Sequence, residues 1–269
     1  MKTILSLIDF SDVSTNALSF AAELSKRASA HLKIINILKE AEADEETINK
    51  MKSLESELKK TFGADLNCES SLAHGNLIPT LKKILSVQRP DLIVMGTKGA
   101  SGLKRILIGS NTVNVIKNTS VPVLVIPEVA RFEDFIKNGK NRIILATDLD
   151  SLENEGALDI LKEIALLIID PKIRVLSVRP KNTKLSGEKR MERDALLALF
   201  NPEIETARVT VFSNNVMGGI NFYLNEKSND TGMVAMIARD SHFIIERHFT
   251  REMASNTHLP LLVLHDGKQ

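Results

Sequence analysis

Short runs of apolar residues alternate along the chain with longer stretches in which apolar residues recur every three or four positions. The first pattern predicts buried strands and the second predicts amphipathic helices. Four helices are expected in the first half, the clearest over Ala17–Ala28 and over Ile48–Phe62, where Gly63 ends the helix. The five expected strands between them are Thr3–Ile8, His31–Leu38, Ala64–Ala73, Asp91–Met95 and Val121–Ile126. Strands alternating with helices indicate an α/β fold with a parallel sheet.

The same order of elements starts again at Arg142, so the chain carries one pattern twice with a period of about 138 residues. Two landmarks fix the repeat: Asp148 ends a strand as Asp9 does, and Pro260 precedes the last strand as Pro122 does. The strands expected in the second half are Arg142–Thr147, Lys172–Val178, Thr206–Phe212, Met233–Ile237 and Leu261–Leu264. The helices expected there are Ala157–Leu167, Met191–Phe200, Val216–Leu224 and a final one before the last strand.

This repeat divides the 269 residues into two domains, each slightly shorter than the usual size of about 150 residues. We expect domains over residues 1–128 and 141–269, joined by a linker over residues 129–140. The linker places charged residues around Phe132, Phe135 and Ile136, which is compatible with a short amphipathic helix. A simple tether is its ordinary interpretation, and a docking segment is the alternative.

Composition excludes several classes of partner. The 35 basic and 34 acidic residues nearly cancel, which argues against binding to nucleic acid or to an anionic membrane. The apolar runs Ile4–Ile8 and Ile164–Ile169 are too short to span a membrane. Cys68, the single cysteine, alternates with Leu66 and Leu72 and is therefore expected to be a buried strand residue. A cytoplasmic location follows as the expectation.

A glycine-rich stretch links the fourth expected strand to the helix that follows it. Four glycines, Gly96, Gly99, Gly102 and Gly109, fall within 14 residues. Glycines in such a loop let backbone N–H groups approach a ligand closely. Ser110 then stands at the start of the helix, where unpaired amides and the helix dipole favour an anion. The stretch predicts a phosphate site.

Residues of the first strand should share this site. In an open parallel sheet the ligand lies beyond the carboxyl ends of the strands, at the point where the strand order reverses. With the order 3-2-1-4-5, that point lies between the first and fourth strands, so Asp9 would stand beside the loop that begins at Gly96. Asp9 and Ile37 could then hold a base while the glycines hold phosphates. Asp9 could equally cap the first helix.

The chain resembles the universal stress protein family in its nucleotide-binding branch. Gly96, Gly99, Gly109 and Ser110 match the family motif Gly-x2-Gly-x9-Gly-Ser/Thr without gaps. The resemblance implies two tandem open parallel five-stranded sheets of order 3-2-1-4-5 with helices on both faces, the adenine nucleotide alpha hydrolase-like fold. It also implies ATP, bound with Mg²⁺, and pairing through the last strand of each sheet. By position, Asp9 and Ile37 would contact adenine, Met95 and Gly96 the ribose, and Gly99, Gly109, Ser110, Asn111 and Thr112 the phosphates. Family members often carry a small apolar residue at Asn111.

The second half departs from the motif. Arg247, His248, Phe249 and Thr250 stand opposite Gly109–Thr112, and no glycine lies between Ala238 and Asp266. Asp148 is the one site residue that remains. We therefore expect one nucleotide site per chain, in the first domain, and a degenerate second domain.

No catalytic signature accompanies the motif. Ser110 lacks the preceding lysine of a P-loop, and the six histidines show no metal-ligand spacing. We expect no catalytic residue and at most weak ATP hydrolysis. The leading hypothesis is a stress-response protein whose nucleotide state regulates its conformation or partner binding, with the two domains paired within one chain. An interaction module without a nucleotide is the alternative, and homodimerisation stays open.

Overall fold

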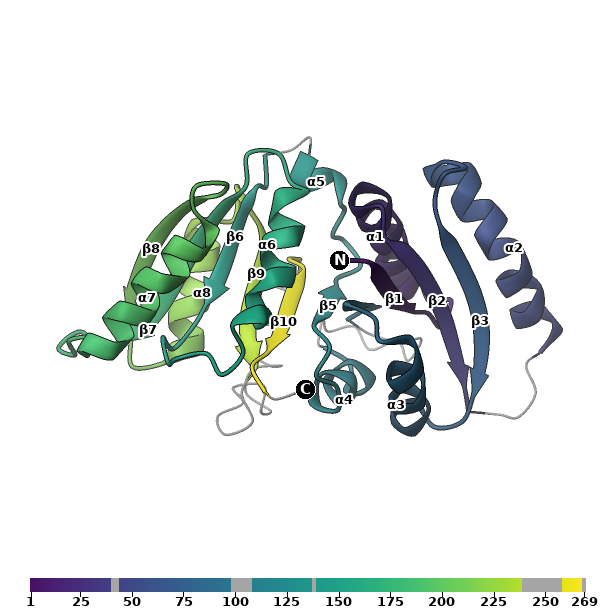
Figure 1. Cartoon of the computed structure of the whole chain (residues 1–269), viewed down its shortest axis with the longest axis horizontal. Helices are drawn as coiled ribbons and strands as arrows, with labels where there is room; N and C mark the ends of the chain where they lie inside the picture. Colours follow the sequence, from purple (N-terminus) through teal and green to yellow (C-terminus); the bar gives the residue numbers. More distant parts are fainter. Residues whose placement is uncertain (40–43, 98–107, 137–138, 239–257, 268–269) are drawn as a thin grey trace. The chain divides into compact units, whose positions relative to one another are not determined.

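The computed structural model describes residues 1–39, 44–97, 108–136, 139–238 and 258–267. Its chain forms two compact units, Met1–Phe132 and Glu133–Gln269. Each unit contains five parallel strands with helices on both faces of the sheet, which confirms the α/β fold class (Figure 1). The two units are described separately below.

In the first unit the strands lie in the order β3-β2-β1-β4-β5, and all neighbouring pairs are parallel. The central strand β1 pairs on one side with β2 and on the other with β4, so that Ile4 stands beside both Leu32 and Leu92. All three side chains are fully buried, which explains why these strands read as apolar runs and not as alternating patterns. The strands are β1 (Thr3–Leu7), β2 (His31–Leu38), β3 (Cys68–His74), β4 (Leu92–Gly96) and β5 (Val123–Ile126).

Four helices cover this sheet. Crossovers between parallel strands are right-handed. The two helices that connect β1 to β2 and β2 to β3 therefore lie on one face of the sheet, and the two that connect β3 to β4 and β4 to β5 lie on the other. Accordingly α1 packs beside α2, and α3 packs beside α4 (Figure 1). The helices are α1 (Asp12–Ala28), α2 (Glu45–Phe62), α3 (Leu77–Gln88) and α4 (Ser110–Lys117).

The outer strand β3 starts later than predicted. Ala64 and Asp65 form a turn in which the Leu66 N–H donates to the Gly63 carbonyl at 3.1 Å, and the strand begins only at Cys68. Cys68 is buried as expected, at 6% exposed, and burial raises the pKa of its thiol. These facts argue against a reactive cysteine.

The second unit repeats this topology with the order β8-β7-β6-β9-β10. Its strands are β6 (Arg142–Ala146), β7 (Lys172–Arg179), β8 (Glu205–Phe212), β9 (Thr231–Ala238) and β10 (Leu261–His265). Its helices in the described residues are the short 3-10 helix η1 (Glu155–Leu158), α6 (Asp159–Leu166), α7 (Gly187–Phe200) and α8 (Val216–Glu226). In Figure 1, α6 and α7 lie on one face of the sheet and α8 on the other. The final helix expected before the last strand falls on residues 239–257, outside the described residues.

One turn has the same geometry in both units. Phe10 and Leu149, which follow the aspartates at the ends of β1 and β6, have φ angles of 60° and 61°. In each turn the aspartate Oδ1 accepts a backbone N–H from two residues further on, from Ser11 onto Asp9 and from Asp150 onto Asp148, both at 3.1 Å. Side-chain hydrogen bonds of this kind stabilise a turn that a non-glycine residue would otherwise avoid. The match supports the internal repeat predicted from the sequence.

The segment predicted as a linker is divided between the two units, and each part packs within its own unit. Phe132 lies edge-on to Phe20, with ring centroids 5.0 Å apart, and Asn16 Nδ2 donates to the carbonyls of Pro127 and Ala130. In the second unit the helix α5 (Glu133–Ile136) buries Phe135. The domain boundaries at residues 128 and 141 stay a prediction.

Gly232 on β9 lies directly against the chain segment that contains and follows α5. A Cβ atom there would lie 2.1 Å from the Lys140 carbonyl oxygen and 2.6 Å from Phe135 Cε1. No side chain fits at that position without moving the backbone after α5. The absence of a side chain at Gly232 is therefore a packing requirement of the second unit.

Among the described residues, no helix is both long enough and apolar enough to cross a membrane.

The substitution Gly232→Ala tests the close packing of Gly232 against the Lys140 carbonyl and the Phe135 ring. We expect it to lower the free energy of unfolding of the second unit by about 1–3 kcal/mol through overpacking, as measured by urea denaturation. Gly187→Ala is the matched control, because a Cβ at Gly187 has no heavy atom within 4 Å, and it should change stability by less than about 0.5 kcal/mol. Equal midpoints for the two variants would contradict the packing argument.

Candidate functional site

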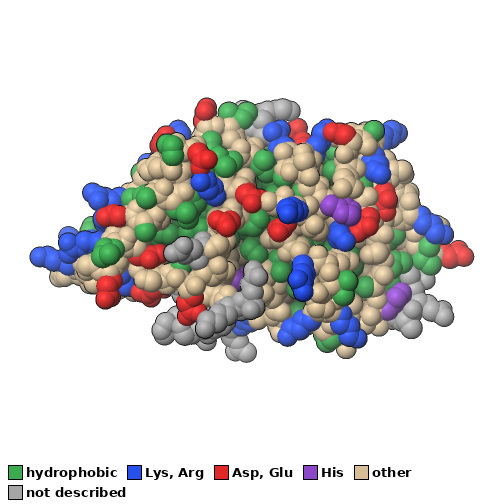
Figure 2. All heavy atoms as spheres, in the orientation of Figure 1, with side chains coloured by type: hydrophobic (Ala, Val, Ile, Leu, Met, Phe, Trp, Pro, Cys, Tyr) green, Lys and Arg blue, Asp and Glu red, His purple; other side chains and the backbone are tan. Residues whose placement is uncertain are grey.

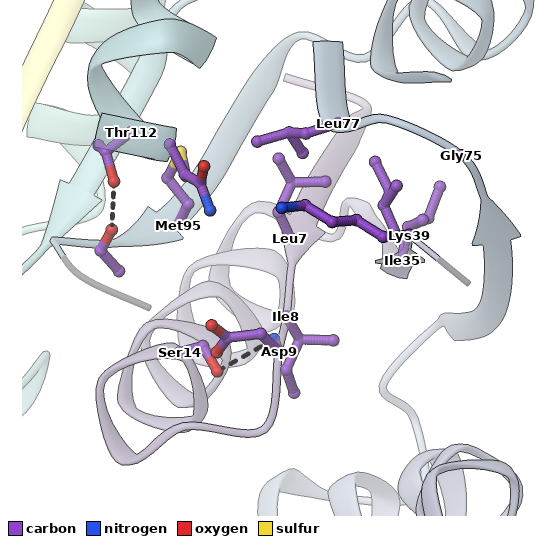
Figure 3. Close-up of a pocket in the computed structure, with 13 residues that line it drawn as sticks. Leu7, Ile8, Asp9, Ser14, Ile35, Lys39, Gly75, Leu77, Met95 and Thr112 are labelled. Carbon is purple, nitrogen blue, oxygen red and sulfur yellow. Dashed lines mark hydrogen bonds between the residues drawn. The ribbon is translucent and has the colours of Figure 1, made fainter. Parts of the chain in front are cut away.

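A pocket opens at the carboxyl ends of β1, β2 and β4 in the first unit, with a cavity volume of about 140 Å³ (Figure 3). This is the edge of the sheet where the strand order reverses, and it is the position predicted for the ligand. Thirteen residues line the pocket: Leu7, Ile8, Asp9, Ser14, Ile35, Ile37, Lys39, Gly75, Leu77, Met95, Gly96, Asn111 and Thr112.

The pocket brings together most of the residues predicted to bind a nucleotide. Six of the nine line it, namely Asp9, Ile37, Met95, Gly96, Asn111 and Thr112. Gly109 and Ser110 precede Asn111 at the start of α4 but are not lining residues. Gly99 lies outside the described residues, as do the loop cations Lys98, Lys104 and Arg105.

Asp9 occupies the turn after β1 and is exposed to solvent. Its Oδ1 accepts hydrogen bonds from the Ser11 N–H at 3.1 Å and from the Ser11 hydroxyl at 2.5 Å. Ser11, not Asp9, caps α1, because the Ser11 side chain accepts from the Ser14 N–H at 3.3 Å. The alternative role of Asp9 as the helix cap is therefore wrong. The turn holds the Asp9 carboxylate at the rim of the pocket (Figure 3).

Gly96 ends β4 at the closest approach of α1 to the sheet. A Cβ atom at Gly96 would lie 2.7 Å from Val13 Cγ1 and 3.1 Å from the Val13 carbonyl carbon and oxygen. Because two of these atoms belong to the backbone, the neighbour cannot simply rotate away. Gly96 is thus required for packing, independently of any ligand.

Thr112 joins the start of α4 to the end of β4. Its hydroxyl donates to the Gly96 carbonyl at 3.0 Å and is buried (Figure 3). The Gly109 N–H donates to the Thr97 carbonyl at 2.5 Å, so the two ends of the intervening segment are held together. The one donor of Gly109 is therefore used within the protein and is not available for the phosphate contact predicted for it.

The amino end of α4 has no side-chain cap. Gly109 stands at the cap position, with φ −67° and ψ 157°, and it has no oxygen to offer the first turn. The amides of Ser110, Asn111 and Thr112 belong to the first turn of the helix, where an α-helix offers no internal acceptor. By contrast, Asp44 at the cap of α2 accepts from the Thr47 N–H at 2.6 Å. The start of α4 therefore presents donors that have no acceptor among the described residues, together with a positive dipole end beside the pocket, which favours an anion.

Several lining residues were missed by the sequence analysis. Lys39 follows β2, and its side chain extends across the pocket toward Leu7 (Figure 3). Gly75, with φ 128°, donates its N–H to the Leu38 carbonyl at 2.8 Å and turns the chain so that Leu77 reaches the pocket. The signal was present, since Gly75-Asn76 stands between a strand and a helix just as Gly109 does.

The corresponding place in the second unit is built differently. Ile237 pairs with Leu264 as Gly96 pairs with Ile126, so a branched side chain takes the place of the glycine, one residue before the end of β9. After Asp148 the chain forms no helix before η1 at Glu155, whereas α1 starts three residues after Asp9.

Asp266 stabilises the longer connection that results. Its buried Oδ1 accepts the N–H groups of Glu153 and Asn154, at 2.7 and 2.9 Å. The residues predicted to stand opposite Gly109–Thr112, at positions 247–250, lie outside the described residues.

Comparison with known proteins gives a consistent result. The model of the Universal stress protein family matches residues 1–127. Universal stress protein MJ0531 of Methanocaldococcus jannaschii is 33% identical over 140 residues, which cover 46% of this chain and 81% of that protein. The putative universal stress protein SH1215 of Staphylococcus haemolyticus is 30% identical over 149 residues, which cover 50% of this chain and 89% of that protein.

Similarity of structure extends over both units. The crystal structure of a universal stress protein from Archaeoglobus fulgidus superimposes with a TM-score of 0.71 at 18% sequence identity. The alignment covers 98% of each chain. At this identity the likeness shows the shared fold.

Proposed function

The chain belongs to the universal stress protein family, and from this premise we propose that its first unit binds ATP and that nucleotide occupancy regulates conformation or partner binding. The observation that carries the proposal is the pocket at the ends of β1, β2 and β4. There an apolar wall, a carboxylate and an uncapped helix start lie around one cavity. These are the three kinds of contact that adenine, its amino group and a phosphate chain require.

Each part of ATP has a matching part of the pocket. Leu7, Ile35 and Ile37 offer an apolar surface for the adenine ring, with Asp9 at the rim as an acceptor for its amino group. Met95 and Gly96 lie between this end and α4, where the ribose would stand. The free amides of Ser110 and Asn111 would receive the phosphates.

Mg²⁺ would accompany the nucleotide. It is usually held by substrate phosphates, water and one or two protein carboxylates. Asp9 is the one carboxylate among the thirteen lining residues, which fits a metal bound mainly through ATP. No other lining residue could act as a general base toward the γ-phosphate, so we expect hydrolysis to be slow at most.

We assign the second unit a structural role without ATP. Ile237 and the late start of α6 remove two features on which the first pocket depends. Asp148 nevertheless keeps the turn of Asp9, which offers a matched comparison within one molecule.

Asp9→Asn and Asp148→Asn test which unit binds ATP. Asparagine still accepts the turn hydrogen bond but removes the charge. We expect Asp9→Asn to raise the Kd for ATP about tenfold or more, through loss of a charged acceptor for the adenine amino group, and Asp148→Asn to leave it within twofold. Calorimetric titration supplies both Kd and stoichiometry. Equal effects of the two variants on the Kd, or a larger effect of Asp148→Asn than of Asp9→Asn, would contradict the assignment.

Gly109→Asp tests the role of α4. The backbone angles of Gly109 nearly equal those of Asp44, −65° and 158°, so an aspartate fits there and would cap α4. We expect the urea midpoint to hold or rise slightly while ATP affinity falls at least tenfold, because the carboxylate occupies the amides and repels phosphate. Gly109→Asn adds the cap without the charge and should weaken ATP less. If Gly109→Asp bound ATP as tightly as wild type, the proposal that the start of α4 binds the phosphates would be wrong.

The alternative of an interaction module without nucleotide has a direct test too. Mass spectrometry of the protein purified from cells should detect a bound adenine nucleotide. If none is retained and wild type binds none at millimolar concentration, the nucleotide proposal fails and the alternative stands.

We further propose that the two units pair within one chain through β5 and β10, and that the protein acts in the cytoplasm. Unpaired edge strands favour association, and pairing inside the chain would remove two of them. Sedimentation equilibrium at micromolar concentration should then give the mass of a single chain. A stable dimer would show that the last strands pair between chains or that another surface associates.

A further inference from the structure

A second cavity, of about 220 Å³, lies in the second unit where β7 ends and α7 begins. Four of its five lining residues are cationic: Arg179, Lys184, Arg190 and Arg193, with Leu185 as the fifth. The stretch 179–193 holds six basic and two acidic residues, a net charge of +4, whereas the whole chain has a net charge of +1. Figure 2 shows Lys and Arg side chains gathered at this end of the unit.

Interactions within the unit hold the three guanidinium groups in place. Arg179 stacks over the Phe212 ring at 4.9 Å, and its buried Nε finds no hydrogen-bond partner among the described residues. Arg190 donates from Nε and Nη2 to the Leu185 carbonyl, at 3.1 and 3.0 Å. Arg193 is 17% exposed and donates from Nε to Asp194 Oδ1 at 2.8 Å. The cations are therefore ordered before any ligand arrives, which lowers the entropy lost on binding.

The start of α7, which leads to Arg190 and Arg193, is also fixed by hydrogen bonds and an ion pair. Lys189, in the first turn of α7, donates to the Asp148 carbonyl at 2.9 Å and pairs with Asp150 at 2.7 Å. Ser186 caps the helix by accepting the Lys189 N–H at 3.2 Å. The start of α7 is thereby fixed to the end of β6.

In the described residues, the charge around the cavity is only partly balanced by carboxylates. Asp194 pairs with Arg193, and no other ion pair there involves Arg179, Lys184 or Arg190. Like charges brought around a small cavity repel one another, and a bound anion removes that repulsion. Arginine forks match the oxygens of phosphate in particular.

We propose that this cavity binds a small phosphorylated ligand through one or two phosphate groups. Its size fits a compact anion, and its lining comes from the end of β7, the loop that follows and the first turns of α7. An extended nucleic acid would instead need a strip of cations along the surface. Leu185 supplies an apolar contact for the rest of the ligand. The site is separate from the ATP pocket, which lies in the other unit.

Inorganic pyrophosphate is the probe for the test, titrated calorimetrically into the full chain at low salt. Because pyrophosphate could also bind at α4, the titration uses the Gly109→Asp background. Lys184→Gln and Arg193→Gln should each raise the Kd about fivefold or more, as expected for loss of a charged hydrogen bond. Lys181→Gln is the matched control, since Lys181 is exposed in the same loop but does not line the cavity. It should stay within twofold.

Amide chemical shifts locate the binding. Pyrophosphate should move the resonances of residues 179–193 and leave those of residues 108–113 in place. Shifts confined to residues 108–113, or equal effects of Lys181→Gln and Lys184→Gln, would overturn the proposal. So would a twelve-nucleotide single strand that binds ten times more tightly than pyrophosphate, because the surface would then be a nucleic-acid site. Asp9→Asn and Gly109→Asp test ATP binding in the first unit, whereas Lys184→Gln and Arg193→Gln test phosphate binding in the second. Each proposal can therefore fail without the other.

Discussion

The pocket of the first unit depends on how closely α1 can approach the end of β4. The approach is possible because Gly96 has no side chain where the backbone of Val13 passes. It lets α1 begin directly after the turn of Asp9, and it brings Ser14 and the start of α4 to the same cavity. The missing Cβ thus sets how closely α1 packs on the sheet. Gly96 is therefore needed for packing, whatever ligand the pocket takes.

The second unit has the same topology, but no helix begins directly after the turn that follows its first strand. With Ile237 near the end of its fourth strand, the chain after Asp148 takes a longer course, and the Asp266 carboxylate binds the amides of Glu153 and Asn154. The turn of Asp148 is unchanged. The two units therefore share the end of the first strand and differ at the end of the fourth. We attribute their proposed difference in ligand binding to the residues at the end of the fourth strand.

Elements with a long apolar face were predictable from sequence, because burial imposes the period of the strand or helix. All ten strands were found, with errors at the ends. The polar first turn of α7, which starts at Gly187 and not near Met191, carries no apolar signal, and its cap Ser186 marks the true start. At the pocket, spacing along the chain identified Gly96 and Asn111. Lys39 and Leu77 could not be found in this way, because only the pairing of β2 with β3 brings their loops together.

The hydrogen bond between Gly109 and Thr97 has a consequence for how this site can vary. It closes the chain on either side of residues 98–107, so the sheet and α4 are positioned whatever lies between. Closing a flexible loop of twice the length costs only about 0.6 kcal/mol more. Residues could therefore be inserted or exchanged in that segment with little effect on folding. Tolerance to insertion is then confined to this closed segment, and the residues that line the pocket keep their positions when its sequence changes.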